Sequence, residues 1–235
     1  MIELLLKVLA SYLVGSLIGG LIVGRLRGGV DIRTLGSGNA GGTNALRTQG
    51  KSFALWVMLI DIGKGILATR VIAPFSIGWL FPSHTALVPA VVLEPGYRSF
   101  DEWLPVVCGL AAIVGHVYPL WYGFRGGKGV ATLVGVVFGV SPQLLLVVLA
   151  AWLVMVMLFG YVGLASIVAA SSIALWVALT GLEPVFPLLW FGFAVAGLVA
   201  FTHRSNIARM RAGTEPRARR LWLLGRARAG NRDRA

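Results

Sequence analysis

The stretch that decides the fold is residues 130–159, VATLVGVVFGVSPQLLLVVLAAWLVMVMLF, which contains no charged residue. About 20 apolar residues of helix cross the hydrocarbon core of a bilayer, so this run is too long for a single span. Ser141-Pro142 divides it, because proline interrupts a helix and restricts the residue before it. The pattern predicts a short helix over 130–140 and a longer one over 142–159, both inside a membrane.

The composition of the whole chain agrees with a membrane protein. Of 235 residues, 57% are hydrophobic and 13% are charged, against about 45–50% and 25% in soluble domains. This excludes a water-soluble globular protein and a disordered chain, which needs low hydrophobicity. The net charge is +12, but the cations flank apolar runs, which favours lipid head groups and anionic substrates over nucleic acid. The single cysteine, Cys108, can form neither an internal disulfide nor a thiolate metal cluster.

Further apolar runs predict five more spans and an all-α, polytopic membrane protein with seven transmembrane helices. The first run opens with Glu3 and lacks a cleavage pattern, so it is read as a retained span and not as a signal peptide. Five or six spans remain the alternative if the 130–140 helix is re-entrant. Residues 1–203 are expected to form a single integral membrane domain, and 204–235 a basic cytoplasmic tail. The five additional spans are expected at residues 2–23, 53–80, 104–120, 164–182 and 185–201.

The distribution of charge predicts the orientation. The connector at 24–51, the loop at 121–128 and the tail from His203 are basic, whereas the 81–103 loop is acidic. Cytoplasmic segments carry the excess of Lys and Arg. With seven spans all three basic segments fall on one side, which places the N-terminus outside and the C-terminus in the cytoplasm.

The first of three polar motifs is GSGNAGGTN at residues 36–44, followed by Arg47. Glycines let backbone N–H groups wrap around an anion, and Ser, Thr and Asn add further donors. The motif contains G-x-G-x-x-G, but a dinucleotide fingerprint needs a strand before it and a helix after it, and here membrane spans flank it. The alternative to an anion site is a flexible polar connector.

The second motif consists of GHVYP at residues 115–119 and FRGGKGVAT at 124–132. It is not a Walker A loop, because Tyr122 and Gly129 stand where glycine and Ser or Thr would be needed. Gly127 and Lys128 at the start of a helix still predict an anion site, because the first N–H groups of a helix are free there. The alternatives are a topology anchor for Lys128 and a packing role for His116.

The third motif is HRSNI at residues 203–207 with GTE at 213–215. His203 and Asn206 are three residues apart, so on a helix they share a face; the alternative is an ordinary polar helix end. Asp61 and Lys64 have the same spacing inside a predicted span, where they form either a structural ion pair or a pocket wall. Ser166 is a further candidate for the pocket, and its alternative role is to pack helices closely.

The residues restrict the chemistry that these motifs can perform. Scattered histidines and few acids give no metal ligand set, and neither His116 nor His203 has an acid nearby in sequence. The H-x-x-x-x-D pattern of the better-known glycerolipid acyltransferases is absent. What remains is a set of anion-binding groups at one membrane face. An enzyme accounts for the three motifs better than a small membrane transporter of an anionic solute, since the motifs lie at one face without repeat symmetry. A lipid-binding scaffold explains the basic tail only.

The motifs, in their order, resemble the acyl-phosphate-dependent glycerol-3-phosphate acyltransferases of bacterial membranes, the PlsY family. The similarity covers G-S-G-N-x-G-x-T-N-x-x-R, D-x-x-K-G, G-H-x-x-P with G-G-K-G-V-A-T, and H-R-x-N-I with G-T-E. It implies transfer of a fatty acyl group from acyl-phosphate to the 1-hydroxyl of sn-glycerol-3-phosphate, which gives lysophosphatidic acid and phosphate in phospholipid biosynthesis.

The same resemblance implies the site residues and the partners. Ser37, His203 and Asn206 would be catalytic, and His203 or a substrate phosphate would be the base. Neither a metal nor a cofactor is implied. The implied partners are the two substrates, membrane lipids and the enzyme that makes acyl-phosphate. The implied location is the bacterial inner membrane, with the active site at its cytoplasmic face. The residues expected to bind the substrates and their phosphates are Gly38, Asn39, Gly41, Thr43, Asn44, Arg47, Gly127, Lys128 and Ser166.

Overall fold

The structure is a computed structural model that describes residues 2–76 and 95–223, and the regular elements in these ranges are helices. The chain divides into two compact units, Met1–Ser141 and Pro142–Ala235. The division falls at Ser141-Pro142, where the sequence predicts a break between two helices.

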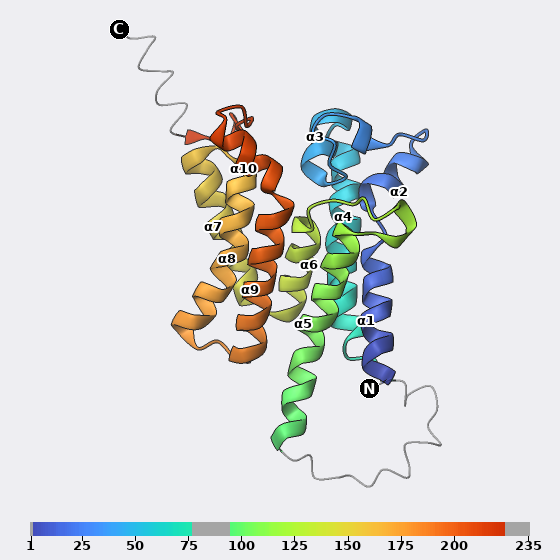
Figure 1. Cartoon of the computed structure of the whole chain (residues 1–235), viewed down its shortest axis with the longest axis vertical. Coiled ribbons are helices and arrows are strands. Elements are labelled where there is room, and N and C mark those ends of the chain that lie inside the picture. Colours follow the sequence, from blue (N-terminus) through green and yellow to red (C-terminus); the bar gives the residue numbers. More distant parts are fainter. Residues whose placement is uncertain (1, 77–94, 224–235) are drawn as a thin grey trace. The chain divides into compact units, whose positions relative to one another are not determined.

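The described part of the first unit is built from six α-helices that run through or cap a bundle. Within it α1 packs against α5, and α4 packs against α6 (Figure 1). Glycines bring these helices close together: a Cβ at Gly15 would overlap the backbone of Ala112, and one at Gly135 would overlap the carbonyl of Ile62. Small residues at helix contacts are typical of membrane proteins. The helices are α1 (Ile2–Gly15), α2 (Gly19–Leu26), α3 (Gly42–Gln49), α4 (Lys51–Leu67), α5 (Pro95–Val117) and α6 (Val130–Val140).

Up to residue 223, the second unit consists of three long helices and a short one. These are α7 (Pro142–Phe159), α8 (Val162–Thr180), α9 (Val185–Thr202) and α10 (Arg204–Arg211). The central helix α8 packs against both α7 and α9. A Cβ at Gly192 would come too close to the backbone of Ala174, so α8 and α9 also approach through a glycine. Only His203 separates α9 from α10, which packs back against α8 and α9.

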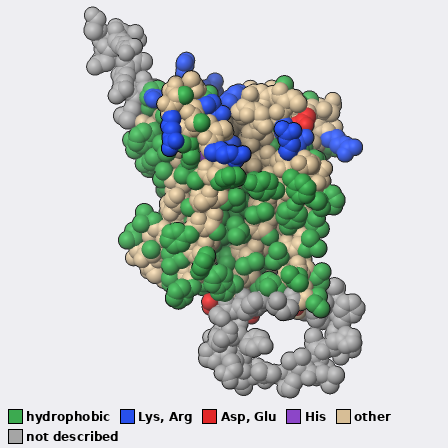
Figure 2. Space-filling view, in the orientation of Figure 1, with side chains coloured by type: hydrophobic (Ala, Val, Ile, Leu, Met, Phe, Trp, Pro, Cys, Tyr) green, Lys and Arg blue, Asp and Glu red, His purple; other side chains and the backbone are tan. Residues whose placement is uncertain are grey.

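The exposed faces of these helices are apolar, as expected for lipid contact. Four helices among the described residues are long and apolar enough to span a membrane, or five if the bent pair α1 and α2 counts as one span. In each unit, hydrophobic side chains cover the flanks of the long helices and the Lys and Arg side chains gather at one end (Figure 2). The fold is therefore an all-α, polytopic membrane protein with about four to five candidate spans. The four single helices cover Asp101–Tyr122, Pro142–Phe159, Val162–Thr180 and Val185–Thr202.

Most predicted helices agree with the structure. The break at Ser141-Pro142 and the helices at 130–140 and 142–159 are confirmed. The two helices that follow begin and end within two residues of the predicted positions. The predicted run 53–80 corresponds to α4 and a π-helical turn at Ala68–Ile72. Its last residues, 77–80, lie outside the described part of the chain.

The structure differs from the prediction in three details. The run 2–23 is not one continuous helix, because it breaks between Gly15 and Gly19 and bends by 47°. The 81–103 segment is not a loop throughout, since α5 already begins at Pro95; residues 77–94 lie outside the description. The 24–51 connector contains the helix α3. The apolar composition of residues 2–23 does not reveal the first break, because polar groups from α4 stabilise it.

Candidate functional site

The first glycine-rich loop is organised around the buried side chain of Asn44. Its Oδ1 accepts a hydrogen bond from the Ser37 N–H at 2.9 Å. Its Nδ2 donates to the carbonyls of Ile32 at 2.8 Å, Asn39 at 2.9 Å and Leu35 at 3.0 Å. A buried amide that satisfies so many backbone groups fixes the loop in one shape. The side chain of Asn44 thus forms its hydrogen bonds with the backbone of the loop itself.

This loop presents an exposed polar surface around the start of α3. Gly36 and Gly38 have φ angles of +57° and +72°, which glycine adopts without a steric penalty. Ser37 between them is exposed, and so is Thr43 in the first turn of α3. Gly41 is the N-cap of this helix and supplies no side-chain cap. The arrangement leaves N–H groups of the first turn available for an anion.

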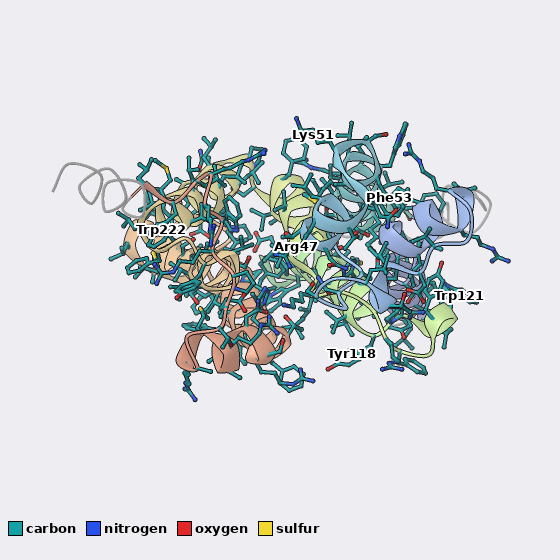
Figure 3. All side chains as sticks on the ribbon, turned by 90° about the horizontal axis from the view of Figure 1, so that it is seen from above. Arg47, Lys51, Phe53, Tyr118, Trp121 and Trp222 are labelled. Atoms are coloured by element: carbon teal, nitrogen blue, oxygen red, sulfur yellow. The ribbon has the colours of Figure 1, made fainter. Side chains whose placement is uncertain are left out.

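Arg47 places a positive charge on the same short helix. It is exposed on α3. Viewed from above in Figure 3, Lys51 lies at the outer edge of the first unit, whereas Phe53, which is 2% exposed, lies among the helices. The guanidinium can therefore reach an anion without a change in the packing of the unit.

The second glycine-rich loop folds back on the end of α5. Gly126 N–H donates to the Val117 carbonyl at 3.2 Å, and Gly127 N–H donates to the His116 carbonyl at 3.1 Å. A Cβ at Gly126 would overlap the same His116 carbonyl, so only glycine fits there. Gly129, with a φ of +81°, is the N-cap of α6 and provides no side-chain cap. The half-buried Lys128 directly precedes this helix start, which combines a cation with free N–H groups.

Arg33 joins the two loops. It donates from Nε and Nη2 to the carboxylate of Asp31, with a shortest distance of 2.7 Å. Its Nη1 also donates to the Arg125 carbonyl at 2.9 Å. The hydrogen bonds from Arg33 keep the pKa of Asp31 below its usual range. The first and second motifs therefore lie at the same end of the first unit.

A buried ionic cluster lies beneath these loops. Lys64 Nζ is 3.0 Å from Asp61 Oδ1 and 2.8 Å from His116 Nδ1. Asp61 is 0% exposed and accepts a hydrogen bond from the Gly19 N–H at 3.1 Å, while Lys64 donates to the Leu17 carbonyl at 2.8 Å. These two side chains satisfy backbone groups that the break between α1 and α2 leaves unpaired. The spacing of Asp61 and Lys64 thus marks a structural ion pair, and the tertiary structure adds His116 to it.

His203 occupies the junction of α9 and α10 in the second unit. It is 4% exposed. Its Nδ1 lies 2.8 Å from the Val199 carbonyl. A carbonyl only accepts hydrogen bonds, so Nδ1 carries a proton, and in the neutral form of the ring Nε2 holds the lone pair. This tautomer is the one that a general base requires.

Asn206 at the start of α10 is held by Glu215, another residue of the third motif. Its Nδ2 donates to Glu215 Oε1 at 2.6 Å, and the other carboxylate oxygen of Glu215 accepts from Arg209 Nε at 2.6 Å. A Cβ at Gly163 would lie too close to the Asn206 side chain, so the start of α8 passes directly beside it. One turn further along α8, the buried Ser166 donates its hydroxyl proton to the Val162 carbonyl at 2.9 Å.

The structure gathers the predicted residues into two groups, one in each unit. The first and second motifs lie together in the first unit, and the third motif lies near Ser166 in the second. Sequence reasoning missed the role of Arg33, because it used the cations of the 24–51 connector only to predict the orientation. Asp31 also accepts a hydrogen bond from the Arg33 N–H, which forms a local turn. An Asp-x-Arg sequence is a weak signal for a turn of this kind. Among the described residues, no group of three His, Cys, Asp or Glu side chains could hold a metal ion.

Comparison with known sequences identifies the family. Residues 5–213 match the family model described as glycerol-3-phosphate acyltransferase. The glycerol-3-phosphate acyltransferase of Chlorobium phaeobacteroides (strain BS1) is 38% identical over 242 residues, which cover 93% of this chain and 98% of the relative. That of Aquifex aeolicus (strain VF5) is 37% identical over 213 residues and covers 91% and 98% of the two chains.

Two solved structures have the same fold. Both are crystal structures of PlsY (YgiH), described as an integral membrane glycerol 3-phosphate acyltransferase, and both are 35% identical in sequence to this chain. The glycerol 3-phosphate form has a TM-score of 0.74 and the lysophosphatidic acid form 0.72; each match covers 91% of this chain and 94% of the other. The chain therefore belongs to the PlsY family of integral membrane glycerol-3-phosphate acyltransferases.

Proposed function

We propose that this enzyme transfers a fatty acyl group from acyl-phosphate to the 1-hydroxyl of sn-glycerol-3-phosphate. The products are lysophosphatidic acid and inorganic phosphate, in the first acylation step of phospholipid synthesis. The observation that carries the proposal is the meeting of two glycine-rich loops at one end of the first unit, joined by Arg33. Both substrates carry a phosphate, and each loop leads into a helix start that suits an anion. The acyl chain of the donor accounts for a membrane fold.

The chemistry needs no covalent intermediate on the protein. The hydroxyl oxygen attacks the acyl carbonyl carbon, the bond between that carbon and the phosphate oxygen breaks, and phosphate leaves with the electron pair. The hydroxyl proton passes to a base. Catalysis then consists mainly of positioning and of stabilising negative charge.

The proposed roles follow from the contacts in each unit. Ser37, Gly38, Asn39, Gly41 and Thr43 form the polar face of the first loop. The resemblance implies that Asn44 contacts phosphate directly. We propose instead that Asn44 holds this loop in shape through its hydrogen bonds to the backbone. Arg47, Gly127 and Lys128 supply charge and N–H groups to phosphate.

His203 and Asn206 supply the remaining roles. Nε2 of His203 holds the lone pair that can accept the hydroxyl proton, and a substrate phosphate is the alternative base. Asn206, fixed by Glu215, orients the acceptor. Ser166 packs beside these residues on α8 and lines the acceptor side.

The proposal includes seven spans, with the N-terminus outside and the three motifs at the cytoplasmic face of the bacterial inner membrane. It treats residues 1–203 as one acyltransferase domain and 204–235 as a basic tail. The segregation of the acidic 81–103 segment from the three basic segments supports this topology. The enzyme that makes acyl-phosphate is the proposed protein partner.

The direct test is an assay of the purified protein in detergent with glycerol-3-phosphate and one of three donors: acyl-phosphate, acyl-CoA or acyl-carrier protein. We expect lysophosphatidic acid and phosphate in equal amounts from acyl-phosphate. Robust activity with acyl-CoA and none with acyl-phosphate would contradict the proposed donor and leave the family assignment intact.

A further inference from the structure

Lys64 is enclosed by three hydrogen-bond acceptors. Its Nζ lies 2.8 Å from the Leu17 carbonyl, 2.8 Å from His116 Nδ1 and 3.0 Å from Asp61 Oδ1. An ammonium group has three N–H donors and no acceptor. Each donor of Lys64 therefore has one partner, and the partners come from the break after α1, from α5 and from α4 itself.

This arrangement decides which nitrogen of His116 carries the proton. Because the ammonium cannot accept a hydrogen bond, Nδ1 of His116 must offer a lone pair to it. The neutral imidazole then holds its proton on Nε2. Asp61 Oδ1 lies 3.4 Å from the same Nδ1, and without Lys64 this carboxylate would favour a proton on Nδ1. Lys64 thus selects the tautomer.

The protonated edge of His116 faces the second glycine-rich loop. A Cβ at Gly127 would overlap His116 Nε2, and its next contacts would be the two ring carbons beside that nitrogen. The Gly127 N–H also donates to the carbonyl of His116. The loop therefore contacts both the backbone and the ring of His116, a residue that is 2% exposed.

We propose that Lys64 is a positioning residue that locks His116 in its Nε2–H form, and that this edge of the ring sets the shape in which residues 126–129 bind a substrate phosphate. The chain of contacts runs from Asp61 through Lys64 and His116 to Gly127. It links the break in the first span to the glycine-rich loop. The tautomer follows from the contacts alone, whereas its effect on phosphate binding rests on the proposed function.

The tautomer can be measured without any assay of activity. Protein with ¹⁵N-labelled histidine is reconstituted in nanodiscs, and the His116 signals are assigned by their loss in His116→Asn. At neutral pH we expect Nδ1 to be unprotonated and Nε2 to carry the proton. In Lys64→Met we expect the proton to move to Nδ1, where Asp61 accepts it. If Lys64→Met does not fold, the double variant Asp61→Asn/Lys64→Met removes both buried charges, and the same switch is expected because the amide oxygen at position 61 still accepts.

Kinetics test the link to the loop. The two conservative replacements of His116 separate its two nitrogens: asparagine retains an acceptor near Nδ1, whereas glutamine returns an N–H near Nε2. We expect His116→Asn to raise the KM of a phosphate-bearing substrate about tenfold, with a smaller fall in kcat, and His116→Gln to recover most of that loss. Lys7→Met, which breaks the Glu3–Lys7 ion pair in the same unit, is the matched control and should behave like the wild type.

The outcomes separate the two proposals. A wild-type His116 protonated on Nδ1, or on both nitrogens, would overturn the inference, as would an unchanged tautomer in both Lys64 variants. Equal kinetics of His116→Asn and His116→Gln would overturn the link to the loop. The expected tautomer in a protein that shows no acyltransferase activity with acyl-phosphate and glycerol-3-phosphate would instead count against the proposed function.

Discussion

Neighbouring residues of the first glycine-rich loop have different tasks. Asn44 is buried and satisfies four backbone groups of the loop, whereas Ser37 and Thr43 are exposed on its surface. In the sequence all three are small polar residues within one motif. Burial and hydrogen bonding therefore separate the residue that shapes the loop from those that can meet a ligand.

The cations of the two loops give the first prediction at this scale. Arg47→Ala and Lys128→Ala should each lower kcat/KM by at least tenfold, which corresponds to about 1.4 kcal/mol, because a charge-assisted hydrogen bond to phosphate is lost. Arg47 is exposed, so the amount of folded protein should not change. Steady-state kinetics and size-exclusion profiles test both points. Arg25→Ala, which removes another exposed cation from the same unit, should retain activity. Normal kinetics in both variants would mean that these residues serve only as topology signals.

The third motif gives the second prediction. His203→Ala and Asn206→Ala should each reduce kcat by at least about tenfold, since one loses the lone pair of Nε2 and the other loses the amide held by Glu215. The pH dependence of kcat/KM distinguishes the two possible bases. If His203 is the base, the acidic limb of the profile should disappear in His203→Ala; if a substrate phosphate is the base, the limb should remain. A loss of activity only in proportion to the yield of protein would mark the motif as a structural helix end.

At the scale of elements, the loops depend on anchors that lie outside the motifs. Arg33 connects Asp31 to the carbonyl of Arg125, which is 92 positions away in the sequence. The Leu17 carbonyl and the Gly19 N–H at the helix break are satisfied by α4. Short glycine-rich segments have little structure of their own, so such contacts determine their shape.

Removing the Arg33 anchor should loosen both loops. In Arg33→Met, amide hydrogen exchange should accelerate at residues 31–39 and 122–127, and the KM of the phosphate substrates should rise several-fold. The pKa of Asp31 is lowered in the folded protein, so the ion pair is complete above the unfolded value of about 4 and is lost only as the pH falls through the lower folded value. The effect of the substitution should therefore be the same at pH 6 and pH 8. A difference that grows with pH in this range would contradict this account of the anchor.

At the scale of the whole molecule, apolar flanks and one basic end characterise each unit (Figure 2). The loop after α5 exposes Tyr118 and Trp121, which are 41% and 57% exposed; Figure 3 shows them on a different side of the first unit from Lys51. Amphipathic aromatic residues of this kind prefer the boundary between lipid and water. Their position at the basic end is consistent with a membrane surface there.

Cysteine labelling in intact cells tests the proposed topology. Cys108 is the single cysteine and is buried, so Cys108→Ala provides the background. Gln49→Cys and Ala227→Cys should be protected from an impermeant maleimide until the cells are opened, whereas Ser83→Cys should react at once. Reaction of Gln49→Cys from outside would contradict the proposed orientation and the argument that the three motifs face the cytoplasm.

The sequence by itself determined the properties that depend on local composition. Runs without charge identify a membrane protein, and Pro142 identifies the break between α6 and α7, because a proline ends a helix whatever surrounds it. The three motifs were also visible in the sequence, since their glycines and polar residues are contiguous. The resemblance that they carry led to the correct family.

The tertiary structure alone decided how distant groups meet. The break between α1 and α2 lies within an apolar run and is stabilised by Asp61 and Lys64, more than 40 positions away. His116 joins this pair from a third helix, and Arg33 reaches a carbonyl of the second loop. Hydrogen bonds and ion pairs depend on distances of a few ångströms, and no local pattern encodes which distant residue will supply the partner.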